Sequence, residues 1–151
     1  MSAESNKALI CRFVEEANHD NLAIIDDVFS PDVVDHAFLS DGSSGITGIK
    51  HDFALVHAAF PDVQYTVDDL IAEDDKVVVR WTARGTHHGE FAGISPTGQQ
   101  VVFSGTDILC VVDGKVVEVW QHADMLGLLH QLGVMLVLQQ LAPVSDDPFQ
   151  A

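Results

Sequence analysis

Acidic and imidazole side chains cluster where a predicted apolar strand ends near the C-terminus. Residues 101–133 read VVFSGTDILCVVDGKVVEVWQHADMLGLLHQLG, two strands joined by Asp113-Gly114 and followed by a helix. The second strand and its end contain Glu118, Trp120, His122 and Asp124. Such groups inside a core are costly unless they are hydrogen-bonded, paired or functional. The pattern therefore predicts a pocket at this end of the sheet.

Asp107 is the candidate general base within these strands. It lies between Thr106 and Ile108 in an otherwise apolar strand. Burial would raise the pKa of its carboxyl, which suits a base or a neutral proton donor. A hydrogen-bonded structural carboxylate, or one that faces outward, remains an equal alternative.

Strand parity separates the other candidates. Glu118, Trp120 and His122 would share one face of the last strand, and Val119 and Gln121 the other. Only one face can border a cavity, and both assignments stay open. Asp124 has the residue type and position of a helix N-cap, and a catalytic role is its alternative.

Three further residues are candidates elsewhere in the chain. His36 follows Asp35, and neighbouring strand residues point in opposite directions, so the two would not share a proton directly. We expect His36 to face the pocket. Trp81 has the pattern of a core residue, with a platform for the ligand as the alternative.

Motifs for metals, nucleotides and serine nucleophiles are missing. His87-His88 are adjacent and His51 and His57 are six apart, so neither pair has the spacing of two ligands on one helix face. The sequence contains no H-E-x-x-H, G-x-G-x-x-G, G-K-[ST] or G-x-S-x-G. We expect no metal and no cofactor.

Composition excludes several kinds of partner. The 151 residues include 7 basic and 23 acidic ones, with a net charge of −16, so neither nucleic acid nor an anionic membrane surface is an expected partner. The charge favours solubility, or alternatively the steering of a cationic partner. No run of about 18 apolar residues predicts a membrane span. The N-terminus does not resemble a secretory signal, and Cys11 and Cys110 do not form C-x-x-C, so we expect reduced thiols and a cytoplasmic location.

Hydrophobic periodicity predicts an α+β domain. Helical spacing is present near residues 9–17, 22–29, 49–60 and 125–141, and alternation typical of strands near 33–38, 63–67, 77–84, 101–112 and 115–122. Helices precede a run of adjacent antiparallel strands, a layout in which a curved sheet with helices over one face encloses a small-molecule cavity. We expect one domain over residues 1–142 and a flexible tail over 143–151.

Three segments resemble the SnoaL-like polyketide cyclase family, whose members are often labelled ester cyclases. These are AFPDV at 59–63, VVVRWTARGTHHGEFAGISPTG at 77–98, and DGKVVEVW followed by DMLGLLHQLG within 113–133. The resemblance implies a cone-shaped α+β barrel, shared with ketosteroid isomerase and nuclear transport factor two. It also implies a homodimer or homotetramer and a cofactor-free intramolecular aldol condensation.

The resemblance also assigns site positions, and this chain departs from them. The family's catalytic Asp corresponds to Gln121, its assisting His positions to Asp107 and Val119, and a pocket Asn to Asp35. Gln cannot exchange a proton at neutral pH. If Gln121 faces the cavity, Asp107 is the remaining base on the same wall, with His36 or Asp35 opposite. His122 and Asp124 are the candidates if the register or the strand faces differ.

These observations give one leading hypothesis and two alternatives. The leading one is a lyase- or isomerase-like enzyme that cyclises or isomerises an apolar, carbonyl-bearing, polyketide-like substrate. Residues expected to bind the substrate are Asp35, Phe60, Trp81, Val119 and Gln121. The alternatives are a ligand-binding module without chemistry and an accessory protein for polyketide hydroxylation.

The resemblance and the strand pattern together predict dimerisation. The outer face of the sheet is expected to be apolar, because so few helices cannot cover all four valines of the strands, and an exposed apolar sheet face normally finds a partner. The four are Val77, Val79, Val101 and Val116.

Overall fold

The computed structural model describes residues 2–37 and 45–135. Helices and strands follow in the order α1 (Ala3–Asn18), α2 (Ile24–Val28), β1 (Phe29–Asp35), α3 (Ile46–Ala59), β2 (Gln64–Glu73), β3 (Lys76–Thr86), β4 (Gln100–Val112), β5 (Lys115–Ala123) and α4 (Met125–Gln131). The predicted α+β class is confirmed.

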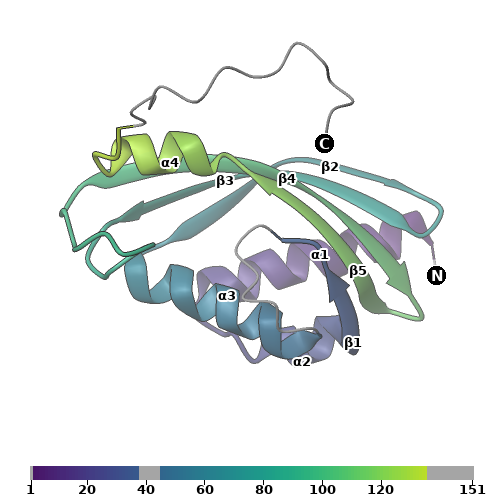
Figure 1. Ribbon diagram of the computed structural model, residues 1–151. Helices are drawn as coiled ribbons and strands as arrows, with labels where there is room; N and C mark the ends of the chain where they lie inside the picture. Colours follow the sequence, from purple (N-terminus) through teal and green to yellow (C-terminus); the bar gives the residue numbers. More distant parts are fainter. Residues whose placement is uncertain (1, 38–44, 136–151) are drawn as a thin grey trace, which may run out of the picture.

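The strands of the described residues form one curved, open sheet in the order β1-β5-β4-β3-β2. β1 runs parallel to β5, and the other neighbours are antiparallel. Helices α1, α2 and α3 lie against the concave face, and α4 follows β5 at one end of the sheet (Figure 1). The core therefore lies between the concave face and the three helices.

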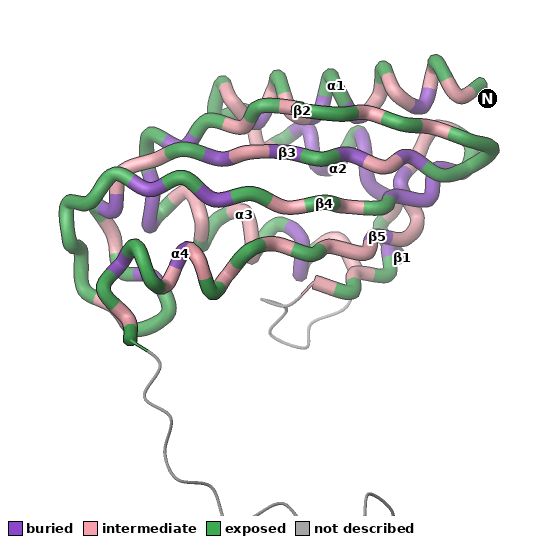
Figure 2. Tube along the Cα trace, turned by 90° about the horizontal axis from the view of Figure 1, so that it is seen from above, coloured by how far each residue is buried: buried purple, intermediate pink, exposed green. Residues whose placement is uncertain are grey.

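The valines expected on the outer face lie on the inner one. Val77, Val79, Val101 and Val116 are all buried, because the sheet curves around the helices and presents these side chains to them. None of the described helices lies in front of the outer face (Figure 2). Exposed apolar side chains of β2 and β4 are instead Ile71, Val102, Ile108 and Val112.

Asn18, the last residue of α1, ties that helix to the start of β2. Its side-chain amide donates to the carbonyl oxygen of Tyr65 at 2.8 Å and its side-chain oxygen accepts from the Tyr65 N–H at 2.7 Å. The Gln64 amide also donates to the Asn18 carbonyl oxygen at 3.0 Å. Because both Tyr65 backbone groups have a partner there, α1 is fixed at this edge of the sheet.

The last helix is shorter than predicted. It ends at Gln131, because Gly133 adopts a left-handed conformation (φ 89°) and the N–H of Val134 bonds to the carbonyl oxygen of Leu129. This is the hydrogen bonding by which glycine typically ends a helix. Residues 136–141 of the predicted helix and the predicted tail lie outside the described residues.

No helix within the described ranges is long and apolar enough to cross a membrane. Both cysteines are free: Cys110 is buried and Cys11 is exposed.

Substitution of Asn18 by Ala should destabilise the fold by roughly 1–3 kcal/mol, because two backbone groups of Tyr65 lose their partner. Urea unfolding would measure this change. Asn21→Ala is the matched control, since the Asn21 side-chain amide bonds to the side chain of Glu16 and not to a backbone group of the sheet. Equal stabilities of the two variants would contradict the structural role of Asn18.

Candidate active site

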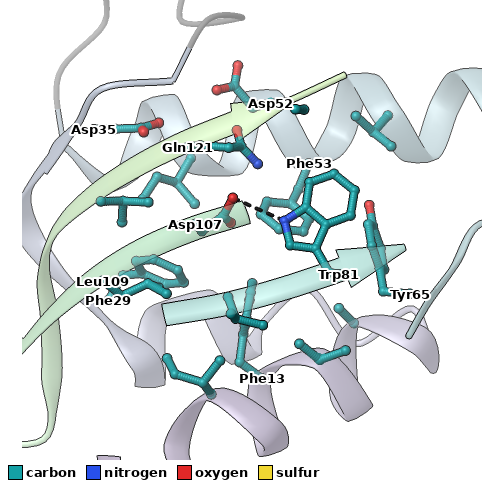
Figure 3. A pocket seen from close by; sticks show the side chains of 18 of the residues that line it. Phe13, Phe29, Asp35, Asp52, Phe53, Tyr65, Trp81, Asp107, Leu109 and Gln121 are labelled. Atoms are coloured by element: carbon teal, nitrogen blue, oxygen red, sulfur yellow. Dashed lines mark hydrogen bonds between the residues drawn. The ribbon is translucent and has the colours of Figure 1, made fainter. Parts of the chain in front are cut away.

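A cavity of about 130 Å³ lies between the concave face of the sheet and helices α1 and α3 (Figure 3). Its wall is mostly apolar and rich in aromatic rings, including Phe13, Phe29, Phe53 and Phe103. The polar side chains that line it are Asp35, Asp52, Tyr65, Trp81, Asp107 and Gln121. An apolar cavity with a few convergent polar groups is the usual form of a small-molecule site.

Asp107 and Trp81 form the central polar contact of this cavity. The indole N–H of Trp81 donates to Asp107 Oδ1 at 3.0 Å (Figure 3). Trp81 lies opposite Gly105 in the strand pair, and a Cβ at position 105 would overlap the indole. Glycine at this position therefore leaves room for the ring to lie flat and reach Asp107.

The cavity perturbs the Asp107 carboxyl. Burial raises its pKa to about 7, the Trp81 hydrogen bond opposes that rise, and the charge of Asp35 adds to it. At neutral pH the carboxyl is therefore divided between its protonated and charged forms. A group in this state can accept and return a proton with little energetic cost.

Asp35 and Gln121 lie on the same side of the cavity as Asp107 (Figure 3). Burial raises the pKa of Asp35, while the N–H of Ala37, 3.0 Å from Asp35 Oδ1, and the charge of His36 lower it. Gln121 is the cross-strand partner of Asp107. Val119, the partner of Asp35, also lines the cavity.

A β-bulge decides which face of β5 borders the cavity. The hairpin register shifts by one residue between Cys110 and Val111, so that Asp107 pairs with Gln121. Upstream of this shift Val116 faces inward, and downstream Val119 faces inward. An extra residue in one strand reverses the faces beyond it, and Gln121 is therefore on the cavity side.

His36 and His122 do not face the cavity, which corrects the expectation for His36. His36 is exposed; its Nε2 lies 2.9 Å from Glu118 Oε1, and its ring stacks on Trp120 at 5.4 Å. Alternation along β1 turns Asp35 inward and therefore His36 outward. His122 is exposed and pairs with Thr106 on the outer face.

Two other predicted site residues have structural roles and do not line the cavity. Asp124 is exposed and caps α4, with its Oδ1 2.9 Å from the N–H of Gly127, so the N-cap interpretation is confirmed. Phe60 is fully buried and lies beside the rings of His87, Phe91 and Phe103 rather than among the cavity residues. It ends α3, where it packs beneath the loop that follows β3.

Sequence reasoning missed Tyr65 and Asp52. Tyr65 alternates with Val63 and Val67, which was the signal that it points inward. Asp52 lies three residues after Ile49 and four before Val56, both of which line the cavity from α3. The same spacing, applied to polar residues, would have found it.

Within residues 2–37 and 45–135, no three His, Cys, Asp or Glu side chains are grouped so that they could hold a metal ion. The side chains that line the cavity include carboxyl groups, which can transfer protons, and the neutral hydrogen-bond donors Tyr65 and Gln121.

A curved sheet folded over helices around an apolar cavity places the protein in a known class of α+β cone folds. The family model of the SnoaL-like polyketide cyclases matches residues 8–132. The chain therefore belongs to the SnoaL-like polyketide cyclase family. No curated protein matches the sequence.

Solved structures with the same fold include three from Streptomyces. AclR, a proposed hydroxylase from Streptomyces galilaeus, is 38% identical, with a TM-score of 0.80 over 87% of this chain and 98% of that one. IdmH, a proposed polyketide cyclase from Streptomyces antibioticus, is 32% identical, with a TM-score of 0.74 over 84% and 97%. TsrD from Streptomyces laurentii is 27% identical, with a TM-score of 0.81 over 89% and 99%.

The raised pKa of Asp107 predicts a pH-dependent stability. The folded chain holds its proton up to about pH 7, whereas the unfolded carboxyl releases it near 3.8, so this group favours folding below pH 4 and that contribution is lost as pH rises to 7. The difference corresponds to about 4 kcal/mol at most. As pH rises from 5 to 9, the free energy of unfolding of wild type should therefore fall relative to that of Asp107→Asn. Urea unfolding at the two pH values measures this change.

Asp32, which is exposed, provides the matched control. The free energy of unfolding of Asp32→Asn should differ from that of wild type by the same amount at both pH values. A stability difference between Asp107→Asn and wild type that is equal at pH 5 and pH 9 would rule out the perturbed carboxyl.

Proposed function

We propose that this protein binds an apolar, carbonyl-bearing, polyketide-like molecule in the cavity and catalyses aldol-type cyclisation or isomerisation without a cofactor. The observation that carries the proposal is Asp107, a carboxyl group that faces an aromatic cavity with its pKa near neutrality. Membership of the cyclase family and the likeness to IdmH support it.

Asp107 acts as the base in this proposal. It removes a proton from the carbon next to a substrate carbonyl, and the electron pair moves to the carbonyl oxygen to form an enolate. Trp81 orients the carboxylate through its N–H. Gln121, on the neighbouring strand, binds a substrate oxygen through its amide. The enolate carbon then attacks a second carbonyl or is protonated at another position.

Specific observations favour two other functions. Gln121 and Val119 occupy positions that the family resemblance assigns to an acid and a histidine, which favours a ligand-binding module that has lost its chemistry. The likeness to AclR favours a role in hydroxylation. Recovery of a tightly bound ligand without alteration would support the first, and oxygen consumption in the presence of reduced flavin the second.

Deuterium exchange into 2-tetralone tests the proton abstraction directly. This bicyclic ketone has acidic protons between its ring and its carbonyl, and their exchange in D₂O is followed by NMR. Wild type should accelerate the exchange, with a rate that rises with pH and levels off above about pH 7 as Asp107 loses its proton. Asp107→Asn should lower the rate by about 100-fold or more, as expected for loss of a general base.

Asp32→Asn again serves as the control and should exchange at the wild-type rate, because Asp32 is exposed and lies outside the cavity. An Asp107→Asn variant that exchanges as fast as wild type would refute the assigned base.

We also propose that a second copy packs on the outer face of the sheet, which would form the homodimer that the family resemblance implies. The exposed side chains of Ile71, Val102, Ile108 and Val112 support this. Sedimentation should give twice the chain mass of 16.4 kDa, and Ile108→Asp should give the single chain. Leu55→Asp, at an exposed position of α3, should leave the mass unchanged; a monomeric wild type would refute the dimer.

A further inference from the structure

Tyr65 is a cavity residue for which the cyclase resemblance gives no role. It enters from β2, and its ring lies beside three others: Trp81 in an edge contact at 6.2 Å, and Phe53 and His57 in tilted contacts at 6.3 Å each. Its backbone is fixed by the two hydrogen bonds to Asn18. The ring is therefore held in place independently of its hydroxyl group.

The hydroxyl group of Tyr65 has no hydrogen-bond partner among the described residues. Tyr65 lines the cavity, and its ring lies beside the Trp81 ring (Figure 3). A phenol in an apolar site normally finds a partner. A ligand oxygen in the cavity would supply one.

The other donors of the cavity restrict which group can serve a substrate oxygen. The N–H of Trp81 already bonds to Asp107. The three carboxyl groups of the lining, Asp35, Asp52 and Asp107, would repel an oxygen that gains negative charge whenever they are ionised. Among the described lining residues, Tyr65 and Gln121 are the neutral donors that remain, and of these two only the phenol can transfer its proton.

The position of Tyr65 relative to Asp107 fits a donor to the substrate oxygen. The two residues flank the Trp81 indole, with Asp107 at its N–H and Tyr65 at the opposite side of the ring (Figure 3). A flat ketone stacked along the indole would present an acidic carbon to one residue and its oxygen to the other. Burial, with the charge of Asp107 added, raises the pKa of Tyr65, so the phenol keeps its proton and acts as a donor.

We infer that Tyr65 is a catalytic hydrogen-bond donor that binds the substrate carbonyl oxygen and stabilises the enolate formed when Asp107 removes the neighbouring proton. In this step the C–H bond breaks, its proton moves to Asp107, and its electron pair ends on the oxygen held by Tyr65. The inference rests on the proposed function of Asp107, and it adds the group that receives the charge.

The test compares two ligands that share one skeleton, 2-tetralone and tetralin, which lacks the carbonyl oxygen. Tyr65→Phe keeps the ring and its contacts but removes the hydroxyl. It should weaken the binding of 2-tetralone by about fivefold, as expected for one hydrogen bond, and leave the binding of tetralin unchanged. Calorimetric titration measures both. A structural role of the hydroxyl would affect the two ligands alike.

Exchange kinetics give the second readout. Tyr65→Phe should lower kcat for deuterium exchange by about 100-fold, the usual effect of losing one oxyanion donor, with a small change in KM. The rate should still level off above about pH 7, because Asp107 remains the base. Thr66→Val, which removes an exposed hydroxyl from the next position of β2, should match wild type in both assays.

The two proposals fail in distinguishable ways. If Asp107→Asn abolishes exchange but Tyr65→Phe retains wild-type kcat and wild-type affinity for 2-tetralone, the donor role of Tyr65 is wrong and the base survives. If wild type neither binds 2-tetralone more tightly than tetralin nor accelerates exchange, both proposals are wrong. A melting temperature of Tyr65→Phe close to that of wild type would establish that the variant folds.

Discussion

The hydrogen bond between Trp81 and Asp107 is the interaction on which the site depends. It holds a carboxyl group inside an aromatic cavity, where burial would otherwise keep that group protonated. Desolvation and the hydrogen bond act in opposite directions on the pKa, and their balance lies near neutrality. The bond requires the indole ring to lie over position 105, and only glycine leaves room for the ring there. Three neighbouring residue types on two strands thus create one reactive group.

The surrounding fold buries this group away from solvent. The sheet curves around α1 and α3, and the ring of Phe13 makes edge contacts with the rings of Phe29 and Phe53 in the cavity wall. Asn18 fixes α1 to the edge of the sheet at Tyr65. The contact that holds α1 against the sheet therefore also sets the position of the Tyr65 ring in the cavity wall.

The family fold of this chain holds a small set of polar groups in an apolar cavity. The four positions at which the resemblance placed the family's site residues, now Asp35, Asp107, Val119 and Gln121, all line one cavity. The resemblance implies other side chains at these positions in the family's cyclases. Within such a scaffold a carboxyl group can act from a neighbouring strand, because cross-strand partners such as Asp107 and Gln121 face the same space.

The sequence by itself determined the class of fold, the strands, the N-cap at Asp124 and the candidacy of Asp107, because these follow from local periodicity and residue type. It did not determine which side chains meet. A one-residue bulge opposite Cys110 set the inward face of the last strand, sheet curvature turned Val77 and Val79 inward, and alternation turned His36 outward. These outcomes depend on register and curvature, which arise only when distant strands pair, so tertiary structure alone decided them.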